Sequence, residues 1–305
     1  MNAVPEPNEL PPLPPRSPEM RLFTPDMWDY ETPESFVPLA GATGILIREI
    51  DTARRFTDGR ALARVYRADP ATERRYAPAI TAVGPKLCLV LSGEGVFELE
   101  GQGELILKES DSWVAPTGSA QTLLDASADF SLLEYEFPML AATTSGTELT
   151  DEMLMRFGPD SYVPTPGFNA TLQRDLDALK ELTQGGAHAT ALRGNPPHVW
   201  AGSPWHLHMQ EIQLAYHLKG EMSFDFEGVG RIDVKPGTFW FQTPFGRHRE
   251  VTVSLDFEGI NVDIPAVAPT TVFVYDEELG EYTATTYGST TDLSEQAGAA
   301  MNESN

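Results

Sequence analysis

An internal repeat constrains the fold of this chain more than any other feature of its sequence. Residues 91–110 and 218–237 align without a gap at an offset of 127 positions. The identical pairs are Leu91/Leu218, Gly93/Gly220, Glu94/Glu221, Phe97/Phe224, Glu100/Glu227, Gly101/Gly228, Gly103/Gly230 and Lys108/Lys235, and a Pro-x-Gly follows at Pro116 and at Pro244. A repeat of this length indicates a duplicated domain, so we expect two related units.

The composition limits both the size and the partners of these units. A chain of 305 residues with 41% hydrophobic residues is long enough for two compact domains, each with its own core. The 21 basic and 45 acidic residues give a formal net charge of -24, which repels phosphate backbones and anionic membrane surfaces. We therefore expect no nucleic-acid partner and no membrane partner. An anionic substrate would have to be held by something locally positive, such as a metal ion or a pocket arginine.

Cysteine usage and the N-terminal sequence bear on cellular location. Cys88 is the only cysteine, and one cysteine cannot build a disulfide framework. The N-terminus lacks the basic region and apolar run of a signal peptide, and no segment approaches the ~20 apolar residues of a membrane span. We expect a cytoplasmic protein.

Composition also divides the chain into segments. Residues 1–43 form a Pro-rich arm, whose prolines favour extended, unpaired backbone. From residue 44 to 140, short alternating or apolar runs are separated by Gly and Asp, which is typical of an all-β sandwich or barrel. Residues 198–265 follow the same pattern, with Phe224 and Phe226 alternating with polar neighbours. These two segments are the expected β domains.

The remaining segments are interpreted as a linker and a tail. Residues 141–197 join the two β domains, and leucines at helical spacing over 171–182, followed by glycines at 185 and 186, predict a helix there. Residues 266–305 are expected to add one strand, at 272–275, before an acidic tail rich in small residues.

Histidines mark only the second copy of the repeat. In a strand, residues two apart project from the same face, so His206 and His208 can direct their imidazoles at one point, and His248 can approach from a neighbouring strand. At the offset of 127, the residues of the first copy are Ala79, Thr81 and Gln121. The sequence thus predicts a metal site in the second unit, although imidazole ligands alone leave the metal open among Fe, Zn, Ni, Cu and Mn.

These histidines and their spacing resemble the cupin superfamily, whose first motif is G(X)5HXH(X)3-4E(X)6G. His206-x-His208, Gln213 and Gly220 reproduce this spacing, with glutamine where the motif has glutamate. The second motif, G(X)5PXG(X)2H(X)3N, is matched at Gly237 and His248, eleven residues apart.

The second motif also departs from the family pattern, because Pro244 is one position late and Thr252 replaces the final asparagine. The resemblance covers about residues 44–265. It implies an all-β bicupin: two jelly-roll (double-stranded β-helix) barrels joined by a short helical linker, of which the first is degenerate and the second binds metal.

Further site residues are expected around the three histidines. Gln213 is a possible fourth ligand, and Glu211 is a competing carboxylate, although it lies on the opposite strand parity from His208 unless the backbone bulges. Candidate substrate contacts are Trp205, Trp240, Gln242 and Arg247, of which the arginine could pair with a carboxylate.

The resemblance also suggests an activity. Three-histidine cupin sites are similar to those of gentisate-, salicylate-, 3-hydroxyanthranilate- and β-diketone-type dioxygenases. This implies an Fe(II) enzyme that uses O2 to cleave or oxidise a small chelating acidic aromatic, enol or keto substrate, and a homodimer. Glutamine at position 213 leaves the metal charge uncompensated, which favours an anionic chelating substrate, and Glu211 is the only carboxylate of the motif that could move a proton, which favours O2 chemistry.

Two alternatives remain open. A non-oxidative cupin isomerase, decarboxylase or lyase would use Zn, Ni or Mn only as a Lewis acid. A non-enzymatic small-molecule-binding bicupin, similar to the seed-storage cupins, is the third. Three histidines retained in one copy argue against the last, because a binding barrel has no need of them.

Overall fold

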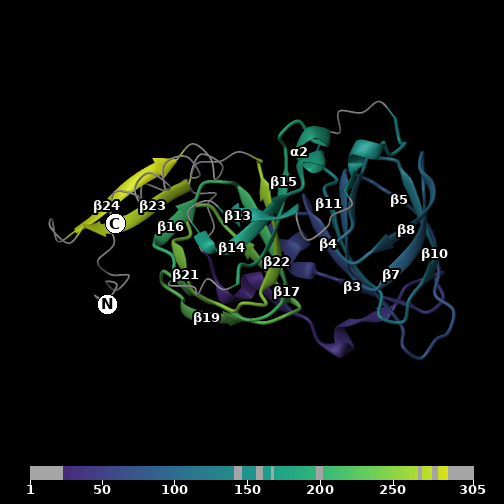
Figure 1. Ribbon diagram of the computed structural model, residues 1–305, viewed down its shortest axis with the longest axis horizontal. Helices are drawn as coiled ribbons and strands as arrows, with labels where there is room; N and C mark the ends of the chain where they lie inside the picture. Colours follow the sequence, from purple (N-terminus) through teal and green to yellow (C-terminus); the bar gives the residue numbers. More distant parts are fainter. Residues whose placement is uncertain are drawn as a thin grey trace. The chain divides into compact units, whose positions relative to one another are not determined.

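The computed structural model describes residues 23–140, 146–155, 161–165, 168–196, 202–266, 270–276 and 281–287. Most of the predicted arm and most of the predicted tail therefore lie outside the described residues. The chain forms two compact units: residues 29–161 with 175–189, here the N-terminal unit, and the rest of the chain, here the C-terminal unit. Strands dominate both units (Figure 1), which confirms the all-β class.

The N-terminal unit consists of two antiparallel sheets. The larger has the order β12-β9-β6-β11-β4-β3-β2 and the smaller the order β5-β10-β7-β8. Their bounds are β2 (Val37–Pro38), β3 (Ile45–Glu49), β4 (Leu62–Ala68), β5 (Ala77–Thr81), β6 (Lys86–Ser92), β7 (Glu94–Leu99), β8 (Gly103–Lys108), β9 (Ser112–Ala115), β10 (Ala120–Ala126), β11 (Ser131–Glu136) and β12 (Leu154–Met155). The sheets enclose a core in which the rings of Phe97 and Trp113, one from each sheet, lie 4.9 Å apart.

The C-terminal unit is also built from two sheets. One has the order β20-β17-β22-β15-β14-β13, extended at the β20 edge by β1, and the other has the order β19-β18-β21-β16-β23-β24. Their bounds are β1 (Trp28–Tyr30), β13 (Val163–Thr165), β14 (Phe168–Asp175), β15 (His188–Gly194), β16 (Trp205–His208), β17 (Ile212–Lys219), β18 (Met222–Phe226), β19 (Gly230–Val234), β20 (Thr238–Gln242), β21 (His248–Val253), β22 (Glu258–Ile264), β23 (Thr270–Asp276) and β24 (Glu281–Tyr287). The strand predicted at 272–275 falls within β23, whereas β24 was not predicted.

Two turns explain why the repeated glycines recur. Gly93, between β6 and β7, has a φ of 67°, and Gly220, between β17 and β18, has a φ of 72°. At these angles a side chain is strained, and an added Cβ would also lie 2.4 Å from the hydroxyl of Ser127 or 2.3 Å from that of Ser254. Each hydroxyl accepts a hydrogen bond from the backbone N–H that follows the glycine, at 2.9 and 2.8 Å. The repeat therefore preserves a turn as well as a sequence.

The helices extend the repeat beyond the segment where residues are identical. Helices α1 (Asp51–Phe56) and α2 (Asp177–Leu182) are each followed by a threonine, Thr57 or Thr183. Both threonine hydroxyls donate to a carbonyl four residues back and accept from the backbone N–H four residues ahead. Helix α2 is thus the counterpart of α1. The sequence analysis did not predict helix α1.

The helix predicted over 171–182 needs correction. Residues 171–175 belong to β14, which pairs with β13 as far as Gln173 and has Leu172 opposite Pro164. Pairing with a neighbouring strand thus prevails over the helical spacing of the leucines. Strands β13, β14 and β15 also contribute to the sheet of β22 and β17, so part of the segment interpreted as a linker belongs to a sheet.

The other helices are single 3-10 turns. They are η2 (Pro25–Met27), η3 (Pro33–Ser35) and η4 (Asp151–Met153). None of the helices in the described part of the chain has the length and apolar composition that crossing a membrane would require.

Candidate metal centre

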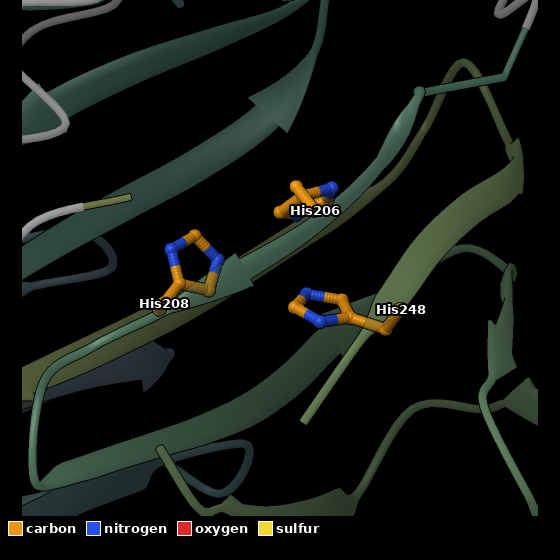
Figure 2. Close-up of side chains that lie close together, drawn as sticks. All are labelled: His206, His208 and His248. Atoms are coloured by element: carbon orange, nitrogen blue, oxygen red, sulfur yellow. The ribbon is translucent and has the colours of Figure 1, made fainter. Parts of the chain in front are cut away.

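The three predicted histidines meet inside the C-terminal unit. His206 and His208 project from the same face of β16, and the Cα of His206 pairs with that of His248 on the neighbouring strand β21. One nitrogen from each imidazole lies within 4.8 Å of the other two, and Figure 2 shows the three rings turned toward a common point. Among the described residues, this is the group of His, Cys, Asp and Glu side chains that could hold a metal.

Backbone carbonyls fix the tautomers of two of these histidines. Nδ1 of His206 lies 2.9 Å from the carbonyl of Pro204, and Nδ1 of His248 lies 3.0 Å from that of Gly246. A carbonyl oxygen can only accept, so each Nδ1 carries a proton, and Nε2 is the ring atom left for a metal. Such contacts to the second ring nitrogen orient metal-binding histidines.

Gln242 holds the same nitrogen of His248 from another side. Its amide nitrogen Nε2 lies 3.0 Å from Nδ1, and both residues are buried. Since Nδ1 donates to Gly246, this contact needs the amide oxygen in place of the nitrogen, an exchange that leaves the shape of the side chain unchanged. Gln242, predicted as a substrate contact, thus lies against a ligand and orients it.

Burial keeps two of the three imidazoles, those of His208 and His248, in the neutral state that metal binding requires. It lowers the pKa of His208 well below its usual value, and the neighbouring His206 and His248 lower it further. Burial, and then His206, likewise lowers the pKa of His248 to about 3. Neutral imidazoles bind metals without first losing a proton. The donor set therefore fits a divalent transition metal.

Glu250 is a site residue that the sequence analysis missed. It follows His248 by two residues on β21, and its Oε1 lies 3.8 Å from Nε2 of His206. Burial alone would raise the pKa of Glu250, but His206, His248 and a hydrogen bond from Ser203 lower it below the usual value. Residues two apart in a strand share a face, so the spacing of His248 and Glu250 was a sequence signal that both side chains lie on the same side of β21.

The two predicted candidates for a fourth ligand are placed differently. The amide nitrogen of Gln213 donates to Asp263 on β22 at 3.0 Å, and that of Gln210 does the same. Burial raises the pKa of Asp263 to about 6, although both amides act in the opposite direction. Glu211 is exposed between β16 and β17. Ligation by the amide oxygen of Gln213 stays a prediction.

Aromatic side chains line the interior next to His248. The ring of Phe226 stacks on His248 at 5.4 Å, and Phe224 lies 6.3 Å from it. Trp240, a predicted substrate contact, packs against Phe224 at 5.6 Å and stacks on Trp28 at 5.7 Å. These rings make the interior next to His248 apolar. Phe224 and Phe226 contact His248, and Trp240 packs against Phe224.

Trp205 and Arg247 lie on the other face of the sheet, contrary to their predicted role. Trp205 belongs to a buried cluster with Leu207, Phe245 and Phe273. The guanidinium of Arg247 lies over the Phe273 ring, and its Nε is 3.5 Å from Glu227. Because adjacent strand residues face opposite sides, Trp205 next to His206 and Arg247 next to His248 point away from the histidines.

The N-terminal unit has an ion-pair network at the corresponding positions. At the offset of 127, Lys86 corresponds to Gln213 and Glu136 to Asp263. The Lys86 ammonium lies 3.2 Å from Glu134 and 3.7 Å from Glu136, and all three side chains are buried. Gln121, which corresponds to His248, donates to Glu134 at 3.1 Å. The ammonium of Lys86 thus takes the place of Gln213, and the amide of Gln121 takes the place of His248 itself.

Comparisons with known proteins show the fold. No family model matches the sequence, and no curated protein matches it. Among solved structures, protein Ylba from E. coli, described with the family model DUF861, has a TM-score of 0.58 and 16% identity over 81% of this chain and 93% of its own. Oxalate decarboxylase from Bacillus subtilis, studied for its Mn(II) centres, has a TM-score of 0.54 and 12% identity over 82% and 80%.

A storage protein shares the fold as well. The 7S globulin of Momordica charantia has a TM-score of 0.56 and 12% identity over 79% of this chain and 84% of its own. These are cupin-fold proteins, and the chain has the predicted bicupin fold of two jelly-roll barrels. At such identities the likeness extends to the fold alone.

Proposed function

We propose that the C-terminal barrel is the active site of a metal-dependent oxygenase, in which His206, His208 and His248 hold one Fe(II). The observation that carries this proposal is the convergence of three imidazoles, with ligand atoms within 4.8 Å of one another, in the C-terminal barrel, whereas the N-terminal barrel buries an ion-pair network. A storage or structural barrel has no use for such a group.

The chain's own residues hold and enclose the site. When bound, the metal would polarise a chelating substrate and, as Fe(II), would pass electrons between the substrate and O2. Gln242 and the Gly246 carbonyl hold the ring of His248 in place, and the carbonyl of Pro204 does the same for His206. Phe226 shields His248 from water on one side.

The charge distribution favours a small anionic substrate that chelates. The net charge of -24 repels anions at long range, so a locally positive group must hold them. Arg247 faces the other side of its sheet, where it pairs with Glu227, which leaves a metal as the positive group at the histidines. Acidic aromatic, enol and keto compounds with two adjacent oxygens fit this requirement.

A non-oxidative reaction that uses Zn, Ni or Mn as a Lewis acid is the second candidate, and Glu250 favours it. The sequence favours O2 chemistry over a non-oxidative reaction partly because the motif offers only Glu211 as a carboxylate that could transfer a proton. Glu250, 3.8 Å from His206, supplies a carboxylate beside the histidines. Isomerases, decarboxylases and lyases require such a group for proton transfer.

Metal analysis and O2 consumption test the two candidates. The protein is purified anaerobically, its metal content is measured, and O2 uptake is followed with gentisate, salicylate, 3-hydroxyanthranilate, β-diketones and α-keto acids. The dioxygenase proposal requires about one iron per chain and substrate-triggered uptake that is lost in His248→Ala and kept in His188→Ala, because His188 pairs with Asp175 and is not one of the three clustered histidines. Zn, Ni or Mn without O2 uptake would favour the second candidate, and a chain that binds no metal would remove both.

The homodimer and the cytoplasmic location also stay proposals. Sedimentation equilibrium of the full chain tests the first, and a mass of one chain at micromolar concentration would contradict it. Fractionation of the source cells tests the second.

A further inference from the structure

A carboxylate oxygen of Glu250 lies close to a ring nitrogen of His206. Oε1 of Glu250 is 3.8 Å from Nε2 of His206, and Nδ1 of His206 donates to the carbonyl of Pro204. Nε2 is therefore the ring atom that faces the carboxylate. A carboxylate next to an imidazole nitrogen in a largely buried site favours a cation between them, which a metal ion supplies.

The orientation of the carboxylate is fixed by Ser203. The hydroxyl of Ser203 donates to Oε2 of Glu250 and accepts from the backbone N–H of Glu250 at 2.8 Å. The backbone N–H of Ser203 donates in turn to the carbonyl of Glu250 at 2.9 Å. These contacts hold Oε2 and leave Oε1 next to Nε2 of His206. In the described part of the chain, the ion-pair partner of this carboxylate is His206 rather than a lysine or an arginine.

We propose that Glu250 is the fourth ligand of the metal held by His206, His208 and His248, a proposal that rests on the function proposed above. Two atoms that each lie about 2.1 Å from one ion are about 3.0 Å apart at a right angle and about 3.4 Å apart at a tetrahedral angle. The present 3.8 Å to Nε2 of His206 exceeds this range, so the Glu250 carboxylate must move toward the three histidines to bind the same ion. The anionic ligand then comes from β21, two residues after His248, while Gln213 on β17 bonds Asp263.

An anionic ligand changes the substrate that the site selects. Three imidazoles leave a divalent metal with two positive charges, whereas Glu250 reduces the charge to one. The site then matches a singly charged bidentate ligand, such as a hydroxy or keto monocarboxylate or an enolate, better than a dianion. A set of imidazole and carboxylate donors also suits Mn and Fe.

Mn(II) binding to the purified full chain tests this ligand, with the affinity and the EPR spectrum of bound Mn(II) as readouts. The variants are Glu250→Gln, which keeps an acceptor for Ser203, and His248→Ala. Glu258→Gln is the matched control, because Glu258 lies on β22 and pairs with Lys219. Circular dichroism verifies that each variant folds.

We expect Glu250→Gln to weaken Mn(II) binding about 10- to 100-fold and to alter the EPR spectrum, and Glu258→Gln to change neither. Unchanged affinity and an unchanged spectrum in Glu250→Gln, with binding lost in His248→Ala, would overturn the role of Glu250 and leave the proposed function standing. A wild-type chain that binds no Mn(II), or a His248→Ala variant that binds it as the wild type does, would overturn both.

Discussion

At the scale of single residues, Gln242 determines how His248 is presented. Its side chain is one of two contacts to Nδ1 of that ring, the other being the Gly246 carbonyl. We predict that Gln242→Leu, which keeps the volume but removes this contact, weakens metal affinity about 10- to 100-fold. Competition with a chelator measures the effect. Gln210→Leu, which removes another buried glutamine, is the control, and an equal loss in both variants would contradict a specific role for Gln242.

Asp263 makes a second prediction at this scale, on stability. Burial raises its pKa to about 6, against about 3.9 in an unfolded chain. Between these values the folded state holds a proton that the unfolded state has lost, so the free energy of unfolding falls as the pH rises from about 4 to about 6 and stays low above that. Asp263→Asn keeps an acceptor for Gln210 and Gln213 and removes the charge.

We therefore expect Asp263→Asn to exceed the wild type in stability by about 3 kcal/mol at pH 7.5, and by progressively less as the pH approaches 4. Urea unfolding at pH 5, 6 and 7.5 measures this difference. A difference that is the same at all three pH values would show that charge burial at Asp263 is not its cause.

The part of the site that follows from the alternation of side chains along a strand was predictable from the sequence. This rule places His206 and His208 on the same face. Applied consistently, it also places Glu250 beside His248 and turns Trp205 and Arg247 to the other face. The contact between Gln242 and His248 could not be predicted in this way, because it depends on how β20 and the turn after it fold back onto β21.

At the scale of elements, the turn between β17 and β18 depends on Gly220. Its φ of 72° strains any side chain, and an added Cβ would lie 2.3 Å from the Ser254 hydroxyl and 2.8 Å from the backbone nitrogen of Phe257. Gly228, between β18 and β19, has a similar φ of 80° with no atom within 4 Å of such a Cβ.

These two glycines separate backbone strain from steric clash. We predict that Gly228→Ala costs about 1 kcal/mol, for the unfavourable φ alone, and that Gly220→Ala costs about 2–3 kcal/mol more because the turn must also open. Urea unfolding of both variants measures the difference. Equal losses of stability in the two variants would contradict a steric clash at Gly220 and leave the positive φ as the cause of both.

Elements were predictable where local pattern and pairing agree. The glycines and alternating apolar residues of the repeat indicated both β domains, and the fold confirms this class. The leucines over 171–182 satisfy a helical pattern, but β13 offers residues up to Gln173 a pairing partner that no local pattern reveals. Helix α1 escaped prediction because it has only six residues, too few to show a period.

At the scale of the whole molecule, the two barrels share a fold and fill corresponding interior positions differently. The N-terminal barrel buries Lys86 between Glu134 and Glu136. We predict that Lys86→Met destabilises this unit by about 3 kcal/mol, because it leaves two buried carboxylates with less compensation. Lys108→Met, an exposed lysine of the same unit, should cost less than about 0.5 kcal/mol. Thermal unfolding measures both, and equal effects would show that the buried pair contributes no more than the exposed one.

Metal removal should act on the other unit. A ligand that binds only the folded state stabilises it by about 2.7 kcal/mol at a hundredfold excess over its Kd. The three histidines lie in the C-terminal unit. We therefore predict that a chelator lowers the midpoint temperature of the thermal transition of this unit. The transition of the N-terminal unit, which Lys86→Met lowers, should not change. Calorimetry with and without chelator measures this, and His248→Ala should abolish the response. A chelator that shifted both transitions equally, or that acted on His248→Ala as strongly as on the wild type, would contradict a single metal site at the histidines.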